Sequence, residues 1–187
     1  FRSGSPRWLC GRDRGAWGAD VTRPHEAKAR EALTALKRRD MTVALAESCT
    51  GGMVAVALTD IPGSSAVVDR GFVTYSNDAK TEMLGVPAEL IREHGAVSEP
   101  VAVAMAEGAL SASPASVSVA ITGVAGPGGS EAKPEGRVHF ACAVRGGMTR
   151  AERQDFGAIG RDRIRDASVD FALGMLIEAA IAVPAKP

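Results

Sequence analysis

A serine lies at the point where an apolar run ends and a glycine-rich turn begins. Residues 42–46 are almost wholly apolar, and they are followed by Glu47-Ser48-Cys49-Thr50-Gly51-Gly52 and then by a helix-compatible stretch. A strand that turns into a helix leaves free backbone N–H groups and the positive end of a helix dipole at the turn. Such donors can stabilise an oxyanion or hold a phosphate, so Ser48 is the first candidate nucleophile. The alternative for Ser48 is capping, because serine is preferred at helix N-termini.

A base for this serine has to come from another part of the chain, because a hydroxyl is a weak nucleophile on its own. None of the three histidines lies in a favourable segment, although His94, in a turn before a glycine, is the best of them. Lys80 can act as the base if burial keeps it neutral, and Tyr75 can orient it or relay its proton. A surface lysine and a tyrosine at the edge of the core are the structural alternatives.

A second glycine-rich segment follows an alternating run that ends at Thr122. Residues 123–129 can wrap backbone N–H groups around an anion. They match neither a Walker A loop nor a dinucleotide-binding loop, and a wide turn is the alternative. Arg161 and Arg165 lie four residues apart on one face of the expected last helix. There they can hold a phosphate or a carboxylate, or form surface ion pairs with the neighbouring aspartates.

Strands that alternate with helices must position these residues. Helices are expected over residues 24–39, 51–59, 77–84, 88–93, 99–110 and 161–182, and strands over residues 41–46, 66–74, 117–122, 136–144 and 148–156. Gly146-Gly147 between the last two strands is a hairpin signal. The pattern predicts a single-domain three-layer α/β/α sandwich, with a mixed, mostly parallel sheet and one antiparallel hairpin.

The first 23 residues differ from the rest of the chain. They contain both tryptophans, several arginines and glycines, and no periodic apolar pattern. We interpret residues 1–23 as an N-terminal extension, either disordered or derived from upstream or cloning sequence, and residues 24–187 as the domain. An arm that binds a partner is the alternative interpretation.

Composition excludes several classes of partner. The chain has 22 lysines and arginines and 22 aspartates and glutamates, so its net charge of zero favours neither nucleic acid nor an anionic membrane. No apolar run approaches the roughly 20 residues that span a bilayer. Three cysteines without metal-ligand spacing are typical of free thiols in a reducing cytoplasm, and no metal site is predicted. The alanine-rich last helix favours a homodimer.

Several short motifs follow one another over residues 27–182. They are Ala46-Glu47-Ser48-Cys49-Thr50-Gly51-Gly52, Tyr75-Ser76-Asn77-Asp78-Ala79-Lys80, Leu84-Gly85-Val86, His94-Gly95-Ala96-Val97-Ser98, Ile121-Thr122-Gly123 with Gly126-Pro127-Gly128-Gly129, and Phe156 with Gly160-Arg161 and Ile164-Arg165. Together they resemble the CinA C-terminal domain family, whose stand-alone members are nicotinamide-nucleotide amidases.

The resemblance implies an amidohydrolase that deamidates nicotinamide mononucleotide (NMN) to nicotinate mononucleotide and ammonia by a Ser/Lys covalent mechanism, without a cofactor or metal. It implies Ser48 as the nucleophile, Lys80 as the general base and Tyr75 as the accompanying tyrosine. The oxyanion and the substrate are then expected to contact Cys49, Thr50, Gly51, Gly52, Thr122, Gly123, Gly126, Gly128 and Arg161. The alternatives are a non-catalytic nucleotide-binding module, an amidase acting on a related amide nucleotide, and a nucleophilic Cys49.

Overall fold

The computed structural model describes residues 24–130 and 133–183, so the expected extension over residues 1–23 lies outside the described residues. Its elements, in chain order, are α1 (Glu26–Arg38), β1 (Val43–Glu47), α2 (Met53–Thr59), a 3₁₀ turn (Ser64–Ala66), β2 (Val68–Val73), α3 (Asn77–Leu84), α4 (Ala88–His94), α5 (Glu99–Ser111), β3 (Val117–Gly123), β4 (Arg137–Val144), β5 (Arg150–Asp155) and α6 (Arg161–Ala182). Each predicted helix and strand is confirmed, and its ends differ from the prediction by at most two residues.

The strands form one mixed sheet in the order β2-β1-β3-β4-β5. β1 pairs in parallel with β2 and with β3, whereas β4 pairs antiparallel with β3 and β5. Four strands therefore run in one direction and β4 runs against them, which confirms the predicted sheet and its hairpin.

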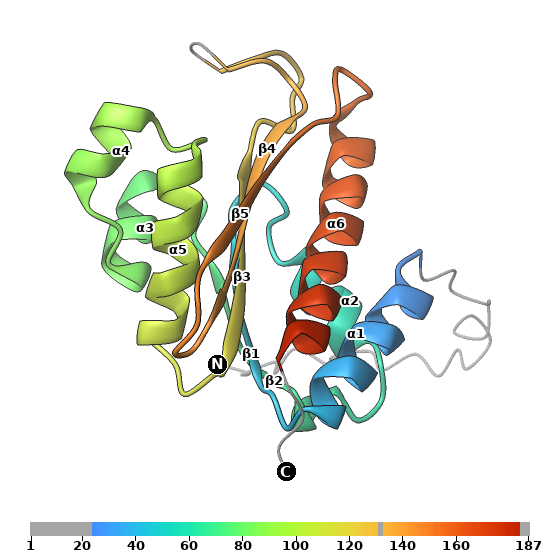
Figure 1. Cartoon of the computed structure of the whole chain (residues 1–187). Helices are drawn as coiled ribbons and strands as arrows, with labels where there is room; N and C mark the ends of the chain where they lie inside the picture. Colours follow the sequence, from blue (N-terminus) through green and yellow to red (C-terminus); the bar gives the residue numbers. More distant parts are fainter. Residues whose placement is uncertain (1–23, 131–132, 184–187) are drawn as a thin grey trace, which may run out of the picture.

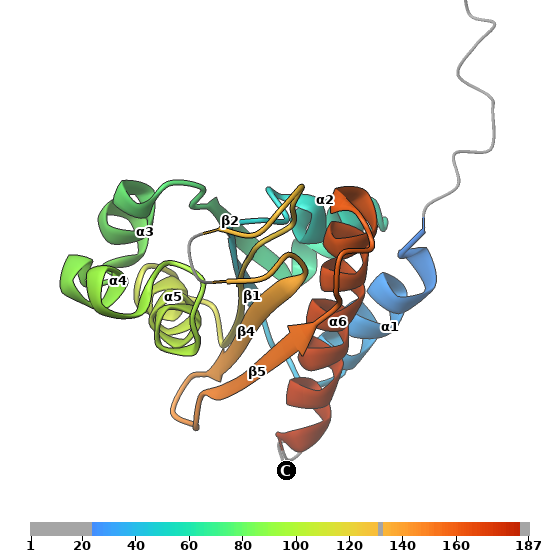
Figure 2. The ribbon, with the colours of Figure 1, turned by 90° about the horizontal axis from the view of Figure 1, so that it is seen from above.

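Helices cover both faces of this sheet, with α1, α2 and α6 on one face and α3, α4 and α5 on the other (Figures 1 and 2). Side chains of β1 alternate between the two layers: Val43 and Leu45 pack in the core beneath α1, α2 and α6, and Ala44 and Ala46 face α5. The α5 face of β3 and β4 is also rich in alanine, and small side chains let a helix approach a sheet closely.

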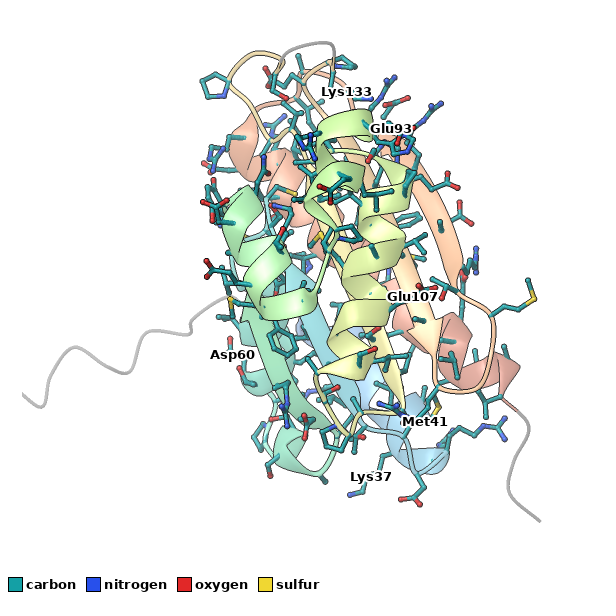
Figure 3. All side chains as sticks on the ribbon, turned by 90° about the vertical axis from the view of Figure 1, so that its left-hand side faces the viewer. Lys37, Met41, Asp60, Glu93, Glu107 and Lys133 are labelled. Atoms are coloured by element: carbon teal, nitrogen blue, oxygen red, sulfur yellow. The ribbon has the colours of Figure 1, made fainter. Side chains whose placement is uncertain are left out.

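The two crossovers from β1 to β2 and from β2 to β3 lie on opposite faces, because α2 and α5 do. In open α/β sheets a ligand crevice forms outside the carboxyl ends of the strands at such a reversal. The carboxyl ends of β2, β1 and β3 meet at one end of the molecule. In Figure 3, Lys133, in the connection that follows β3, marks this end of the molecule, and Lys37 of α1 marks the opposite end. No helix of the described residues is long and apolar enough to cross a membrane.

Candidate functional site

Ser48 is the first residue after β1 and lies between the ends of the two neighbouring strands. Its N–H donates to the carbonyl of Ile121 in β3, at 3.0 Å. The carbonyl of Glu47 accepts from the N–H of Thr74, just after β2, at 2.8 Å. The sheet therefore fixes the backbone of Ser48 on both sides, and only 8% of the residue is exposed.

The side chain of Glu47, and not that of Ser48, satisfies the start of α2. The carboxylate of Glu47 is 1% exposed and accepts the N–H groups of Gly52, Val54 and Ala55 at distances of 3.0, 3.1 and 2.9 Å. The N-cap position is Gly52, and it makes no side-chain capping bond. A carboxylate at the positive end of the helix dipole is stabilising, so Glu47 replaces a capping serine. The capping interpretation of Ser48 is wrong, and its hydroxyl is free for other contacts.

Lys80 belongs to α3, on the face of the sheet opposite to α2, and its side chain contacts this hydroxyl. Its Nζ lies 3.2 Å from Ser48 Oγ and donates to the carbonyl of Thr74 at 3.0 Å. Only 1% of Lys80 is exposed, and no ion pair of the described residues involves it. Burial lowers the pKa of Lys80 because a charged ammonium loses its hydration there. A neutral lysine beside a serine hydroxyl has the geometry of a general base.

Tyr75 lies in the same pocket but is not bonded to Lys80. It is 60% exposed, and its hydroxyl accepts a hydrogen bond from Arg161 Nη2 at 2.9 Å. The other terminal nitrogen of Arg161 donates to the carbonyl of Gly126 at 2.8 Å. Arg161 thus joins the strand end that carries Tyr75 to the second glycine-rich segment.

Cys49 is a poor alternative nucleophile. It is 7% exposed, and burial raises the pKa of its thiol to about 12, with a smaller contribution from the nearby Glu47 carboxylate. The thiolate is the nucleophilic form of cysteine, and it is scarce at neutral pH with such a pKa. Ser48 is therefore the better supported nucleophile of the two.

The backbone donors of the first turn are fewer than its glycine content predicts. Gly51 N–H donates to the carbonyl of Ser48, and Gly52 N–H donates to Glu47. Within the described chain, the N–H groups of Cys49 and Thr50 donate to no other residue. These two are the donors that remain for an oxyanion. Both glycines have positive φ values, 61° and 96°, so the turn needs them for its backbone conformation.

Arg165, one turn after Arg161 on α6, holds the outer side of this turn. Its Nε donates to the carbonyl of Cys49 at 3.1 Å, and its Nη2 donates to the carbonyl of Thr50 at 3.0 Å. The two arginines of α6 therefore bind the two glycine-rich segments separately. The prediction that they share one ligand through a common face is not supported by these contacts.

A carboxylate from a neighbouring part of the chain binds the second glycine-rich segment. Gly128 N–H donates to the carboxylate of Glu135 at 2.6 Å. A Cβ on Gly126 would lie 2.5 Å from the same carboxyl group. Thr122 is 1% exposed, and its hydroxyl donates to the carbonyl of Ala96 at 2.8 Å. The Glu135 carboxylate disfavours a bound anion at the loop, and the positive φ of Gly126, 80°, explains the glycine at that position.

One pocket of about 200 Å³ joins these parts of the molecule. Its walls are Ser48, Cys49, Tyr75, Asn77, Lys80, Ala96, Val97, Thr122, Gly123, Ala125 and Arg161. The predicted Thr50, Gly51, Gly52, Gly126 and Gly128 are not among them. Asn77, Ala96, Val97 and Ala125 are wall residues that the sequence argument did not select, although the first three lie inside quoted motifs. Among the described residues, no group of three histidines, cysteines or carboxylates is placed to hold a metal ion.

Comparisons with known proteins match this arrangement to one family. A family model described as the CinA C-terminal domain matches residues 25–180. The nicotinamide-nucleotide amidohydrolase PncC of Escherichia coli K12 is 54% identical over 143 residues, which are 76% of this chain and 86% of that protein. A CinA-like protein of Akkermansia muciniphila is 53% identical over 72% of this chain and 33% of its own length. The crystal structure of the competence/damage inducible protein CihA from Agrobacterium tumefaciens has a TM-score of 0.79 and 53% identity, covering 82% of this chain and 93% of that one.

Proposed function

Because this chain belongs to the CinA C-terminal domain family, we propose that it is a nicotinamide-nucleotide amidase that hydrolyses the carboxamide of NMN to a carboxylate and ammonia. The observation that carries this proposal is the contact of a buried lysine with a serine hydroxyl, 3.2 Å apart, at the carboxyl end of a central strand. The name of the E. coli relative supports a nicotinamide nucleotide as the substrate.

In the proposed mechanism, neutral Lys80 removes the proton of Ser48 while Oγ attacks the carboxamide carbon. A neutral amine can accept this proton with its lone pair while it donates an N–H to the carbonyl of Thr74. The N–H groups of Cys49 and Thr50 stabilise the oxyanion of the tetrahedral intermediate, a term worth roughly 10²–10³ in rate per donor. The protonated lysine then gives its proton to the leaving ammonia, and water attacks the acyl-enzyme by the same route.

Arg161 is the proposed contact for the phosphate of the substrate. It is exposed and lines the same pocket as Ser48. Of the two sites expected for the phosphate, the glycine-rich loop already carries the carboxylate of Glu135, which repels an anion. Binding the phosphate at a distance from the reacting bond fixes the amide in its attack geometry. Free nicotinamide is therefore a poor substrate in this proposal.

The proposed setting is the cytoplasm, with the enzyme as a homodimer and no nucleic-acid or membrane partner. Cys49 and Cys142 are buried and unpaired in the described chain, as in a reducing compartment. Ala172 and Ala180 of α6 lie in the core, whereas Ala179 and Ala182 line a surface pocket and Ile181 is exposed near the end of the helix, where a partner subunit could pack. Light scattering of the purified protein measures the oligomeric state.

Ammonia release from NMN tests the proposed activity. The wild-type protein is expected to release one ammonia per NMN consumed, and Ser48→Ala is expected to release none while its melting temperature stays within a few degrees. A binding module predicts stabilisation by NMN without ammonia, and an amidase with another substrate predicts ammonia only from a related amide nucleotide. Full activity in Ser48→Ala contradicts the assignment of the nucleophile.

A further inference from the structure

Two charged side chains outside the reaction chemistry bind the backbone around the serine turn, one through N–H groups and the other through carbonyls. The Glu47 carboxylate accepts hydrogen bonds from the N–H groups of Gly52, Val54 and Ala55. The Arg165 guanidinium donates hydrogen bonds to the carbonyls of Cys49 and Thr50. The two side chains come from different elements, β1 and α6. Neither lines the pocket that contains Ser48 and Lys80.

From this geometry we infer that Glu47 and Arg165 are positioning residues that preform the oxyanion site, an inference that rests on the proposed amidase function. Together with the backbone bonds from Gly51 N–H to Ser48 and from Met53 N–H to Thr50, these contacts leave the N–H groups of Cys49 and Thr50 as the backbone donors of the turn that bind no other residue of the described chain. In a trans peptide the N–H of Thr50 points away from the carbonyl of Cys49. The bond from Arg165 to that carbonyl therefore sets the direction of the Thr50 N–H.

Glu47 has a second consequence for what the turn can bind. Its carboxylate fills the positive end of α2, so no anionic group of a ligand is drawn to that helix end. An uncharged carboxamide can still enter, and its oxygen becomes negative only during attack by Ser48. Glu47 thereby keeps the helix end closed to the phosphate of the substrate, while the neighbouring peptide N–H groups stay free for the oxyanion.

The geometry predicts a loss of rate without a loss of binding when either side chain is changed. For Glu47→Gln and Arg165→Lys, kcat with NMN is expected to fall about 10²-fold, because oxyanion donors displaced by even 1 Å lose that much. KM is expected to change less than about threefold, since neither residue lines the pocket. The pH at which kcat/KM rises is expected to stay unchanged, because burial, not Glu47 or Arg165, lowers the pKa of Lys80.

Arg145 offers a matched control for Arg165. Its guanidinium also binds backbone carbonyls, those of Leu110, Ser113 and Ala115, but at the opposite end of β3. Arg145→Lys is expected to lower the melting temperature as much as Arg165→Lys does, and to leave kcat within twofold of wild type. An equal loss of kcat in both arginine variants would assign the effect to general loosening and overturn the inference.

The deciding experiment measures the labelling of Ser48 by a fluorophosphonate, which does not depend on the identity of the amide substrate. In this reaction an Oγ–P bond forms, the P–F bond breaks, fluoride leaves, and the proton goes to Lys80. Mass spectrometry of the labelled peptide gives the rate, which is expected to fall by about the same factor as kcat in Glu47→Gln and Arg165→Lys. Wild-type labelling rates in both folded variants overturn the inference.

Failure of the proposed function gives a different result. A wild-type protein that labels at Ser48 but releases no ammonia from NMN contradicts the substrate, and the labelling rates of the variants still decide the inference. A wild-type protein that does not label at all overturns both. If Glu47→Gln does not fold, Glu47→Asp and Arg165→Lys provide the same comparison.

Discussion

The two glycine-rich segments at the carboxyl ends of β1 and β3 resemble each other in sequence and differ in the side chains that lie beside their backbone donors. In the turn that follows Glu47, two backbone N–H groups remain free beside a serine and a buried lysine. In the loop after Thr122, the Gly128 N–H is bound by Glu135. Glycine content alone therefore does not identify a site for an anion or an oxyanion. The neighbouring side chains distinguish the two segments: a serine and a buried lysine lie beside the donors of the first, and a carboxylate lies beside those of the second.

Burial separates the two segments further. Lys80, which serves the first, is 1% exposed, whereas Arg161, which contacts the second, is exposed to solvent. Burial lowers the pKa of an amine, so that the amine can take up and release a proton near neutral pH. An exposed guanidinium stays protonated, so it can bind an anionic group but cannot accept a proton. Lys80, beside the first segment, is thus suited to proton transfer, and Arg161, beside the second, is suited to holding a charged group.

Of all the changes considered, removal of the buried base is expected to lower kcat the most. Lys80→Met keeps the volume of the side chain but cannot accept the Ser48 proton, so kcat is expected to fall about 10⁴- to 10⁶-fold. The free energy of unfolding is expected to be unchanged or higher, because a buried amine without a counter-ion is replaced by an apolar group. Steady-state ammonia release and thermal melting measure the two effects.

Lys37→Met is the control for this variant, since Lys37 is an exposed lysine at the opposite end of the molecule (Figure 3). It is expected to leave both activity and melting temperature unchanged. Retained activity in Lys80→Met contradicts the assignment of Lys80 as the base that serves the first segment.

Rates measured across a pH series distinguish the role of Lys80 from that of Arg161. Because only neutral Lys80 can take the proton of Ser48, kcat/KM is expected to rise tenfold per pH unit until the pH passes the lowered pKa of Lys80. Arg161 stays charged throughout, so the affinity for the substrate phosphate is not expected to follow this curve. A rate that is flat from pH 5 to pH 9 contradicts a lysine base.

Stability is expected to follow pH in the same direction. The unfolded chain keeps the Lys80 proton up to the ordinary pKa of lysine, while the folded chain has lost it at lower pH because burial lowers the pKa. Between these two pKa values the unfolded state binds more protons, so the free energy of unfolding rises with pH there. Below the lowered pKa the full cost of burying a charged lysine is present. Denaturant titrations of wild type and Lys80→Met, compared across this interval, measure the difference.

An intermediate effect is expected from the backbone of the first turn. Gly52 has φ = 96° and donates to Glu47, so Gly52→Ala strains the turn that carries the free donors. We expect kcat to fall 10- to 100-fold. The control is Gly146→Ala in the β4–β5 hairpin, where φ is 75° and open space surrounds the new methyl group. It is expected to cost comparable stability and to leave kcat unchanged.

Periodicity predicted the elements well because strands covered on both faces are almost wholly apolar and the helices between them begin and end at clear signals. The run Val43 to Ala46 and the Pro100 start of α5 are examples. The resemblance to a family predicted Ser48 and Lys80 as partners, which spacing could not do, since 32 residues separate them. Their contact arises only because β1 and β2 pair in parallel and α3 begins close to the end of β2.

The sequence could not show which donors of the first turn were already in use. Glu47 directly precedes the serine and lies five residues before Gly52, the N-cap of α2. Sequence rules expect a capping side chain at the N-cap position itself, so they do not point to Glu47. Strand alternation gives the missing signal. Val43, Leu45 and Glu47 share the face on which α2 packs, so the carboxylate had to end near the first turn of α2.

A smaller effect is expected when Arg161 is changed. Arg161→Met is expected to raise KM for NMN about tenfold, because an exposed contact with a phosphate contributes roughly 1–1.5 kcal/mol. KM for nicotinamide riboside, which lacks the phosphate, is expected to stay within twofold. Equal losses for both substrates would assign Arg161 to the shape of the pocket, through its contacts with Tyr75 and Gly126, and not to the phosphate.

The smallest effect is expected from Glu135, the carboxylate that occupies the second loop. Glu135→Ala frees the Gly128 N–H and removes a negative charge, so the melting temperature is expected to fall by a few degrees, as the loss of one charge-assisted hydrogen bond implies. KM for NMN is expected to change less than threefold, because Arg161 and not the Gly128 N–H is the proposed contact for the phosphate. A tenfold decrease of KM would show that the loop does bind the phosphate and that Glu135 weakens it. The two segments would then differ in the kind of anion they accept, since both would bind one.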